Sequence, residues 1–432
     1  MVLWAHADKA PSSASGWAHH IVPLRPRTLW LLGSVSLGLF AAWLVVMARQ
    51  QQVDFDVYRM GGQHVLGSGL YSSSLRYETS HLPFTYPPLA ALLFWPVSHL
   101  TTFVGGLVWD GIDMAALTAL IAVSIAATKG RNVVSSDWRT AFLLLIPLGL
   151  LLFPVRQDLE LGQINALLVL MIVADLAARL SWRDRKLPRG VLTGLAAALK
   201  LTPLVFLPYL LATRQWRAAR NMATSFLAAT GALFVIAPGD SWSYFTKDVF
   251  EVKRIGNAGL VIDQTLRAAV GRAGFSAPHA IADLITVAVV CGGIALAALA
   301  YRRSSPLLGV LVCAGTGLLV SPISWPHHYV WVLPVLVWLV AGSDRPAMGL
   351  CWAAAATVPF MVVTPTAPGA VNAIWYVREN AYVISTVIFL VLVGAMLWFR
   401  SRTPDRSKAE AQADDLRSRR PTTVLTSRGD LG

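Results

Sequence analysis

The chain has 432 residues, of which 55% are apolar and only 14% are charged, and its mean hydropathy is +0.57. This composition excludes a soluble globular domain and predicts an integral membrane protein. The net charge of +13 does not indicate a nucleic-acid-binding protein, because the basic residues stand in short clusters between apolar runs and in the tail from Arg400 to Arg428, as expected from the positive-inside rule.

Several continuous apolar runs of about 20 residues are long enough to cross a bilayer core as helices. They do not alternate with polar residues, so membrane-spanning strands are not expected and the fold class is all-α. Cys291, Cys313 and Cys351 lie inside such runs. Their spacing indicates neither a disulfide framework nor a metal site, and we interpret them as packed thiols.

Residues 1–27 are polar and are expected to form a disordered cytoplasmic segment. The first membrane helix is expected from about Thr28 to Met47, a run too long to be a removed signal peptide. Basic residues just before it hold its start inside. Its exit therefore places Asp54 and Asp56 at the outer face of the membrane.

A long outer segment is expected from Arg49 to about Thr102. Within it, the apolar stretch from Leu89 to Trp95 stands between Tyr86-Pro87-Pro88 and Pro96, and it is too short to cross alone. We place it as a helix at the interface or dipping into the membrane. This choice lets all the later basic clusters fall on the cytoplasmic side.

Further spans are expected at about 104–128, 139–153, 164–181, a split pair at 190–200 and 203–213, then 218–237, 277–301, 304–322, 326–342, 346–364 and 380–400. With the first helix they make about twelve, an even number that leaves both termini inside. The transmembrane domain is therefore residues 28–400, followed by a disordered cytoplasmic tail at 401–432. The split pair is inferred from Lys200-Leu201-Thr202-Pro203, because broken helices at membrane depth are tolerated where they line a cavity.

The stretch from Val53 to Gly62 places Asp54, Asp56 and Arg59 directly after the first span. A carboxylate beside a cation suits a general base next to an anionic substrate. The alternative is a solvated juxtamembrane turn.

Two further clusters follow at the ends of later spans. Gln163 and Asn165 belong to a polar stretch from Arg156 to Asn165, where amides suit hydroxyl recognition; a plain polar loop is the alternative. Lys200 places an ammonium inside an apolar run, which is costly unless it is paired. A phosphate would satisfy it, and snorkelling to the interface is the rival interpretation.

The stretch from Ser321 to Tyr329 contains Trp325 and two adjacent histidines, His327 and His328, one of which we expect to contact substrate. Adjacent histidines alone are a weak metal signal, since neighbours on a helix point in different directions. The large outer loop at 238–278 includes Arg254, and an interfacial helix is expected at about 259–270. An ordinary surface loop is the alternative there.

Five motifs in this order resemble those of glycosyltransferase family 87. They are Asp54-Phe55-Asp56-Val57-Tyr58, Tyr86-Pro87-Pro88, Gly162-Gln163-Ile164-Asn165, Lys200-Leu201-Thr202-Pro203 and Ser324-Trp325-Pro326-His327-His328. The family contains actinobacterial polyprenyl-phosphate-mannose-dependent α-1,2-mannosyltransferases of phosphatidylinositol mannoside and lipoarabinomannan synthesis. The resemblance covers about residues 28 to 400.

This resemblance implies a GT-C fold, a helix bundle whose first extracytoplasmic loop carries the catalytic acid and interfacial helices. It also implies a multi-pass protein of the plasma membrane with a lipid-linked sugar donor. The family's base corresponds to Asp54, with Asp56 as the fallback. Tyr58, Tyr86 and Trp325 are expected among the substrate-binding residues.

The hypothesis is an inverting transfer of mannose from polyprenyl-phosphate-mannose to a glycolipid acceptor, a phosphatidylinositol mannoside. Asp54 would take the proton of the attacking hydroxyl. Lys200, Arg59 and one of the two histidines would offset the charge left on the phosphate. No cofactor is required by this scheme, although Asp54 and Asp56 as ligands of a divalent cation remain an alternative.

Two rivals stay open at this stage. The first is a transferase of the same fold that moves another lipid-linked sugar, arabinofuranose or glucose. The second is a polytopic transporter or flippase, which would favour inverted repeats. The sequence contains no repeat of fixed period, and its polar clusters gather on one side of the membrane. Neither the exact acceptor nor the oligomeric state is predicted.

Overall fold

The computed structural model describes residues 49–130 apart from 68, 151–178, 181–182, 185–186, 188–256, 260–274, 279–342, 346–361 and 372–402, with five single positions between 34 and 46. The expected N-terminal segment, nearly all of the C-terminal tail, and most of the spans expected at 28–47 and 139–153 lie outside these residues. The described secondary structure is helical apart from two short hairpins.

The first elements along the chain include both hairpins. They are α2 (Val53–His64), β1 (Ser74–Tyr77), β2 (Ser80–Pro83), α3 (Pro88–Ser98), α4 (Thr102–Lys129), α6 (Phe153–Leu161), α7 (Asn165–Leu176), β3 (Ser181–Trp182), β4 (Arg185–Lys186), α8 (Val191–Leu199), the 3-10 helix η2 (Thr202–Val205) and α9 (Phe206–Ala212). Strands β1 and β2 pair antiparallel with Ser74 opposite Pro83, and β3 and β4 also pair antiparallel.

The remaining described elements are all helical. They are α10 (Trp216–Ile236), α11 (Pro238–Thr246), η3 (Asp248–Phe250), η4 (Val252–Arg254), α12 (Leu266–Arg272), α13 (His279–Arg303), α14 (Pro306–Val320), η5 (Pro326–Trp331), α15 (Val332–Ala341), α16 (Pro346–Met361), α17 (Ala373–Glu379) and α18 (Ala381–Arg402).

The expected helices are confirmed in most of the described ranges. Helix α4 begins at Thr101, whose hydroxyl caps the amide of Val104, and ends at Gly130 in the left-handed conformation, which satisfies free backbone groups at both ends. Helices α10, α13, α14, α16 and α18 begin and end within about three residues of the predicted spans. The short helix predicted after Tyr86-Pro87-Pro88 is α3, with Pro88 at its start.

Other expectations differ from the structure. The stretch from Arg156 to Asn165 was expected to be a loop, but most of it belongs to α6, because the chain turns only at Gly162. The interfacial helix expected at about 259–270 is instead the shorter α12, which begins after Thr265 caps the amide of Ala268. The hairpin β1–β2 was not predicted.

Four described helices, α4, α10, α13 and α18, are long and apolar enough to cross a membrane. The pair α6 and α7, bent by 118°, makes a fifth if it is one span. Helices α7, α14 and α16 have only 12, 15 and 16 residues. The structure is therefore a helical membrane protein, while the number of about twelve crossings stays a prediction.

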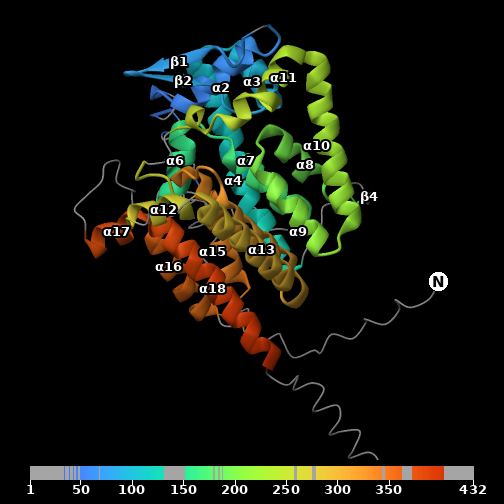
Figure 1. Ribbon diagram of the computed structural model, residues 1–432, viewed down its shortest axis with the longest axis vertical. Coiled ribbons are helices and arrows are strands. Elements are labelled where there is room, and N and C mark those ends of the chain that lie inside the picture. The colour runs from blue at the N-terminus through green and yellow to red at the C-terminus, as the bar shows by residue number, and fades with distance from the viewer. Residues whose placement is uncertain are drawn as a thin grey trace, which may run out of the picture.

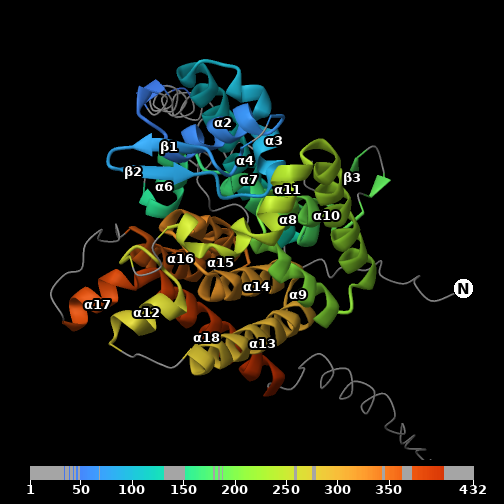
Figure 2. The same cartoon turned by 45° about the horizontal axis from the view of Figure 1, so that its top comes forward.

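The elements gather toward two ends of the bundle (Figures 1 and 2). Helices α2, α3 and α11 and the hairpin β1–β2 lie together at one end, which we call the cap end. Basic residues mark the opposite end, which we call the basic end. There Arg302, near the end of α13, donates to the carbonyl of Ala212 at 2.7 Å, and Asn221 of α10 donates to the carbonyl of Arg189 at 2.9 Å.

The split pair α8 and α9 forms a hairpin inside the bundle. Its first end is at Gly190, where an added Cβ would lie 2.1 Å from the carbonyl oxygen of Ala218, and its second end at Ala212 contacts Arg302. Both ends therefore lie at the basic end. The turn between the helices begins at Lys200, which is extended, and Pro203 follows in η2. A hairpin of this kind places Lys200 at its tip.

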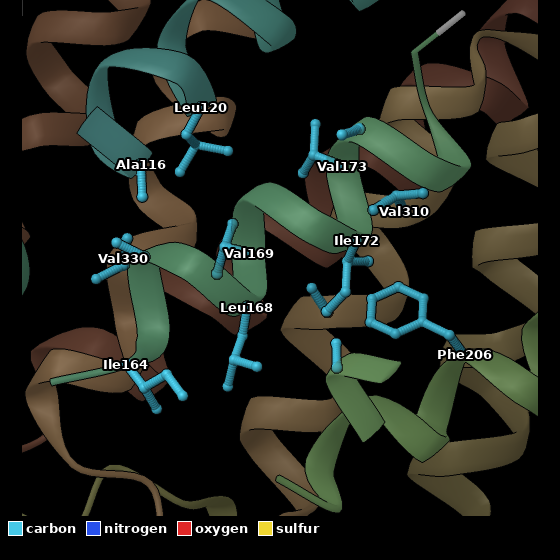
Figure 3. Packing of buried hydrophobic residues seen from close by; sticks show 14 of the residues in the cluster. Ala116, Leu120, Ile164, Leu168, Val169, Ile172, Val173, Phe206, Val310 and Val330 are labelled. Atoms are coloured by element: carbon cyan, nitrogen blue, oxygen red, sulfur yellow. The ribbon is translucent and has the colours of Figure 1, made fainter. Parts of the chain in front are cut away.

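Helix α7 packs at the centre of the apolar core (Figure 3). Leu168, Val169 and Ile172 lie among side chains from α4, α9, α14 and η5. Because α7 is surrounded, the residues at its first turn are held in fixed positions. Those residues, Gln163 to Asn165, are part of the candidate site.

Candidate active site

Asp54 lies in the first turn of α2, and its carboxylate accepts a hydrogen bond of 2.5 Å from Nε2 of Gln163. Burial raises the pKa of Asp54 to about 6, while the hydrogen bond from Gln163 and the charge of Lys200 limit the rise. A carboxylate with a pKa close to neutrality is a stronger base than an exposed one and is still ionised at pH 7.

The loop that supplies Gln163 requires a glycine. Gly162 has φ +66°, and a Cβ added there would lie 2.6 Å from Cβ of Phe55. The left-handed conformation and the close approach both favour glycine. This contact brings the start of α7 directly against α2, so that Gln163 reaches Asp54.

Two tyrosines orient the amide of Gln163. The hydroxyl of Tyr58 donates to Oε1 of Gln163 at 2.8 Å and lies 3.1 Å from the hydroxyl of Tyr86. With Oε1 accepting from Tyr58, the amide nitrogen is directed at Asp54, which fixes the assignment of the two amide atoms. Tyr58 and Tyr86 are thus brought into the site by the structure.

Asn165 connects this group to Lys200. Its Oδ1 accepts from Nζ of Lys200 at 2.9 Å, and its Nδ2 donates to Oδ1 of Asp158 at 2.8 Å. The second oxygen of Asp158 accepts from the amide of Ala166 at 3.3 Å. All three polar side chains are buried, so the chain of hydrogen bonds holds the ammonium group in one place.

Lys200 also meets His328. Nζ of Lys200 lies 3.2 Å from Nε2 of His328 and 5.0 Å from the ring centre of Tyr86. Nδ1 of His328 accepts from the backbone amide of Trp325 at 3.2 Å, and this bond assigns the hydrogen of a neutral ring to Nε2. An ammonium and an imidazole N–H then face each other, and a single anionic acceptor in contact with both would satisfy them.

His327 stands beside this pair, with its ring 4.8 Å from that of His328 in an edge-to-face arrangement. It is buried, and neither of its ring nitrogens has a hydrogen-bond partner among the described residues. A buried polar group of this kind is costly unless a ligand or water satisfies it.

A cavity of about 70 Å³ adjoins these groups. Lys200, His328 and Asn165 line it together with the apolar side chains of Leu168 and Phe206. The cavity therefore combines a cationic end with apolar walls, the combination that a phosphate attached to a hydrocarbon chain requires.

Comparisons with known proteins identify the family of this chain. The sequence model of glycosyltransferase family 87 matches residues 84–322. The chain belongs to this family. It is 34% identical over 401 residues to a polyprenol-phosphate-mannose-dependent alpha-(1-2)-phosphatidylinositol mannoside mannosyltransferase of Mycobacterium tuberculosis, covering 88% of this chain and 92% of the relative.

Two relatives come from Mycolicibacterium smegmatis. The chain is 33% identical over 409 residues to a protein with the same name, covering 86% of this chain and 90% of the relative. It is 34% identical over 319 residues to a phosphatidylinositol pentamannoside mannosyltransferase that also depends on polyprenol-phosphate-mannose, covering 71% of this chain and 74% of the relative. No solved structure matches this family 87 chain. Its family and its long apolar helices together show that the chain is a membrane glycosyltransferase.

Two predicted site residues on α2, Asp56 and Arg59, lie outside the hydrogen-bonded group. Asp56 is half-buried two residues after Asp54, where a helix directs its side chain to a different face. Arg59 donates to the carbonyl of Leu100 at 2.8 Å and so ties α2 to the turn before α4. Its position does not place a charge beside Lys200.

Arg254 also lies outside the group. Its guanidinium donates to the carbonyl of Tyr71 at 2.7 Å and pairs with Asp248 at 3.5 Å. Tyr71 in turn donates to the carbonyl of Tyr86 at 2.7 Å. Arg254 therefore supports the segment that carries Tyr86, one layer behind the site.

Trp325 borders the site through its backbone and its ring. Its amide holds His328, as described above, and a Cβ on Gly256 would lie 2.7 Å from its ring. Gly256 has φ +147°. The indole therefore packs closely against Gly256 in the large loop between α10 and α12.

Asp158 was not among the predicted site residues, although the structure places it at the base of the hydrogen-bonded group. The signal was available: an acid seven residues before Asn165 faces the same side when the chain folds back at Gly162. Without the 118° bend, helical spacing alone does not bring the two side chains together.

The described part of this chain offers few ligands for a bound metal ion. No group of three or more His, Cys, Asp or Glu side chains there is arranged to hold an ion. Asp54 and Asp56, the pair considered from the sequence, face different sides of α2.

Proposed function

We propose that this chain transfers mannose from polyprenyl-phosphate-mannose to a phosphatidylinositol mannoside and forms an α-1,2 linkage. The activity for which the relatives are named supports this substrate pair. The observation that carries the proposal is the connected group from Asp54 through Gln163 and Asn165 to Lys200. It joins a base to a phosphate-binding cation through side chains in direct hydrogen-bond contact.

The proposed donor site is the cavity beside Lys200. The donor phosphate would accept hydrogen bonds from Nζ of Lys200 and from Nε2 of His328, the two donors that face each other at 3.2 Å. The apolar wall formed by Leu168 and Phe206 would contact the first part of the polyprenyl chain. His327, with two unsatisfied ring nitrogens, is a further donor for the same phosphate.

The proposed chemistry is a single inverting displacement. A hydroxyl oxygen of the acceptor forms a bond to the anomeric carbon of mannose as the bond from that carbon to the phosphate oxygen breaks. Asp54 accepts the hydroxyl proton, and polyprenyl phosphate leaves with its charge held by Lys200 and His328. Every proton and electron pair is accounted for without a metal ion.

Gln163 and Asp158 have supporting roles in this scheme. Gln163 binds Oδ2 of Asp54, and Oδ1 would then accept the proton of the acceptor hydroxyl. Asp158 fixes Asn165, which in turn fixes Lys200. Both are positioning residues, since they act through their neighbours.

The charges support the proposed orientation in the membrane. Basic residues at the basic end, such as Arg302 and Arg402, favour the cytoplasmic side of the plasma membrane. The cap end then faces the extracytoplasmic side with the catalytic carboxylate, and both termini are cytoplasmic. This is the arrangement expected of a GT-C enzyme that uses a lipid-linked donor.

The experiment is transfer of labelled mannose from polyprenyl-phosphate-mannose to extracted phosphatidylinositol mannosides by the purified protein. Asp54→Asn is compared with Asp56→Asn, since the two carboxylates share one helix but only Asp54 contacts Gln163. We expect Asp54→Asn to lose transfer by about 10³-fold or more while it still binds donor, and Asp56→Asn to retain most activity.

Failure of the wild-type protein to transfer mannose to any of these acceptors would contradict the proposed substrates. Unlabelled polyprenyl-phosphate-arabinofuranose and polyprenyl-phosphate-glucose serve as competitors. If the protein consumes one of these two donors and not the mannose donor, the proposed sugar is wrong, whereas the proposed fold and the role of Asp54 as base still stand.

A further inference from the structure

A second cleft lies at the basic end, far along the chain from the catalytic carboxylate. It has a volume of about 600 Å³ and opens where the hairpin α8–α9 meets the start of α10. Arg189, Arg214, Arg217 and Trp216 line it, and no acidic residue does so in the described part of the chain. The guanidinium of Arg189 already donates to the backbone carbonyls of Asp175 and Leu176, so the charges of Arg214 and Arg217 are the ones that predict an anionic ligand.

The backbone at Arg214 supports a role for its side chain. Arg214 has φ +59° and closes α9 with two bonds, from its own amide to Leu211 and from the amide of Gln215 to Leu210. This is the position that glycine usually occupies at the end of a helix. An arginine in the left-handed conformation is unfavourable for the turn, so the turn itself does not account for the arginine.

The start of α10 adds to the positive potential. Gln215 at the N-cap forms no side-chain cap, and the first turn contains no acidic residue. Helix N-termini carry a partial positive charge and normally favour acids. Here Arg217 stands in that turn instead, so the first turn of α10 supplies no acidic group to its free backbone amides.

The exposed face of α10 indicates that this anion belongs to a lipid. Trp216 is 61% exposed and Leu227 is 63% exposed, and the two lie three turns apart on the same face of the helix. Beyond the exposed polar residues Arg220 and Thr224, an exposed apolar stripe begins at Leu227 and continues to Phe234 and Val235, along a helix long enough to cross the membrane. A free phosphate would not contact that stripe, whereas the acyl chain of a lipid would cover it.

We propose that this cleft binds the headgroup phosphate of an anionic phospholipid in the cytoplasmic leaflet. The phosphate lies between Arg214 and Arg217, and an acyl chain follows α10 past Leu227. Because Arg214 follows α9 and Arg189, before α8, lines the same cleft, the headgroup lies where the two ends of the hairpin that carries Lys200 at its tip come together. The proposal does not depend on which sugar the enzyme transfers.

The test measures thermal unfolding of the purified full chain in detergent with added phosphatidylglycerol or phosphatidylcholine. Phosphatidylglycerol is expected to raise Tm in a saturable manner, and phosphatidylcholine is expected to have no comparable effect. Arg214→Gln combined with Arg217→Gln is expected to weaken the apparent affinity by about 30-fold. A control variant, with Lys129 and Arg303 replaced by Gln, also removes two positive charges at the basic end. It should show the same rise in Tm with phosphatidylglycerol as the wild type.

Arg214→Gly separates ligand binding from folding. Glycine suits the left-handed position, so Tm without lipid should be unchanged or higher, while the shift caused by phosphatidylglycerol should shrink. The proposal is overturned if the double variant keeps the full rise in Tm with phosphatidylglycerol. It is also overturned if the control variant loses as much of that rise as the double variant does. An equal shift with inorganic phosphate at millimolar concentration would also overturn it, since the ligand would then be a free anion.

Discussion

Gln163 donates a hydrogen bond to the carboxylate of Asp54 across 109 residues of chain. One partner begins an amphipathic helix at the cap end, and the other stands at the bend between two core helices. The bond explains how a carboxylate on a surface helix acquires a defined orientation. It also makes the properties of Asp54 depend on residues that are distant in sequence.

The first prediction concerns pH. Because burial raises the pKa of Asp54 to about 6 and the base must be ionised, kcat/KM should be nearly constant above pH 7 and should fall about tenfold per unit well below pH 6. Activity falls toward low pH because protonation of Asp54 removes the base. An acid limb centred near pH 4, where an exposed carboxyl titrates, would contradict the assignment.

The raised pKa of Asp54 also predicts how this residue affects stability. A carboxyl whose folded pKa lies above its unfolded value favours folding at low pH, and that contribution is lost as pH rises from about 4 through 6. Asp54→Asn should therefore unfold at a temperature equal to or above that of the wild type at pH 7.5, although it is inactive. A clear fall in Tm at that pH would show that Asp54 serves folding and would weaken its role as base.

The third prediction tests Gln163. Gln163→Met keeps the volume of the side chain but removes the donor that lowers the pKa of Asp54. The acid limb of kcat/KM should move to higher pH, with a loss of about 10-fold at pH 7 from poorer positioning. The control is Gln63→Met on α2, whose amide donates at 3.4 Å to the carbonyl of Ser98 and should leave the profile unchanged.

The fourth prediction concerns Lys200. Lys200→Gln retains an amide that can contact Asn165 but removes the positive charge beside His328. Transfer should fall by roughly 10²-fold to 10³-fold in kcat, as when one electrostatic donor to a leaving group is removed. Donor binding by the variant, measured separately, should weaken as well. If kcat is retained and only the melting temperature changes, the ammonium has a structural role alone.

The fifth prediction concerns Gly162. Gly162→Ala should destabilise the fold by about 1–3 kcal/mol, because the left-handed φ and the contact with Phe55 both oppose a Cβ. It should also reduce kcat, since Gln163 moves with the loop. Gly111→Ala is a matched control on α4, where an added Cβ meets nothing within 4 Å and alanine favours the helix. Equal effects of the two substitutions would refute the argument.

The sequence by itself determined the membrane character, the helical class and most helix positions. These depend on local composition: apolar runs of sufficient length have few structures open to them in a bilayer. The motifs around Asp54, Gln163, Lys200 and His328 were also recognisable, because each places polar side chains at the end of an apolar run or, for Lys200, inside one.

Only the tertiary structure decided which of these groups act together. The bend at Gly162 brought Asp158 and Gln163 into the site, and the hairpin α8–α9 placed Lys200 beside His328. Arg59, which follows Asp54 by little more than one turn, is directed instead to the carbonyl of Leu100. The physical reason is that contacts across 109 or 128 residues depend on how whole helices pack, and the spacing of polar residues along the chain does not specify that packing.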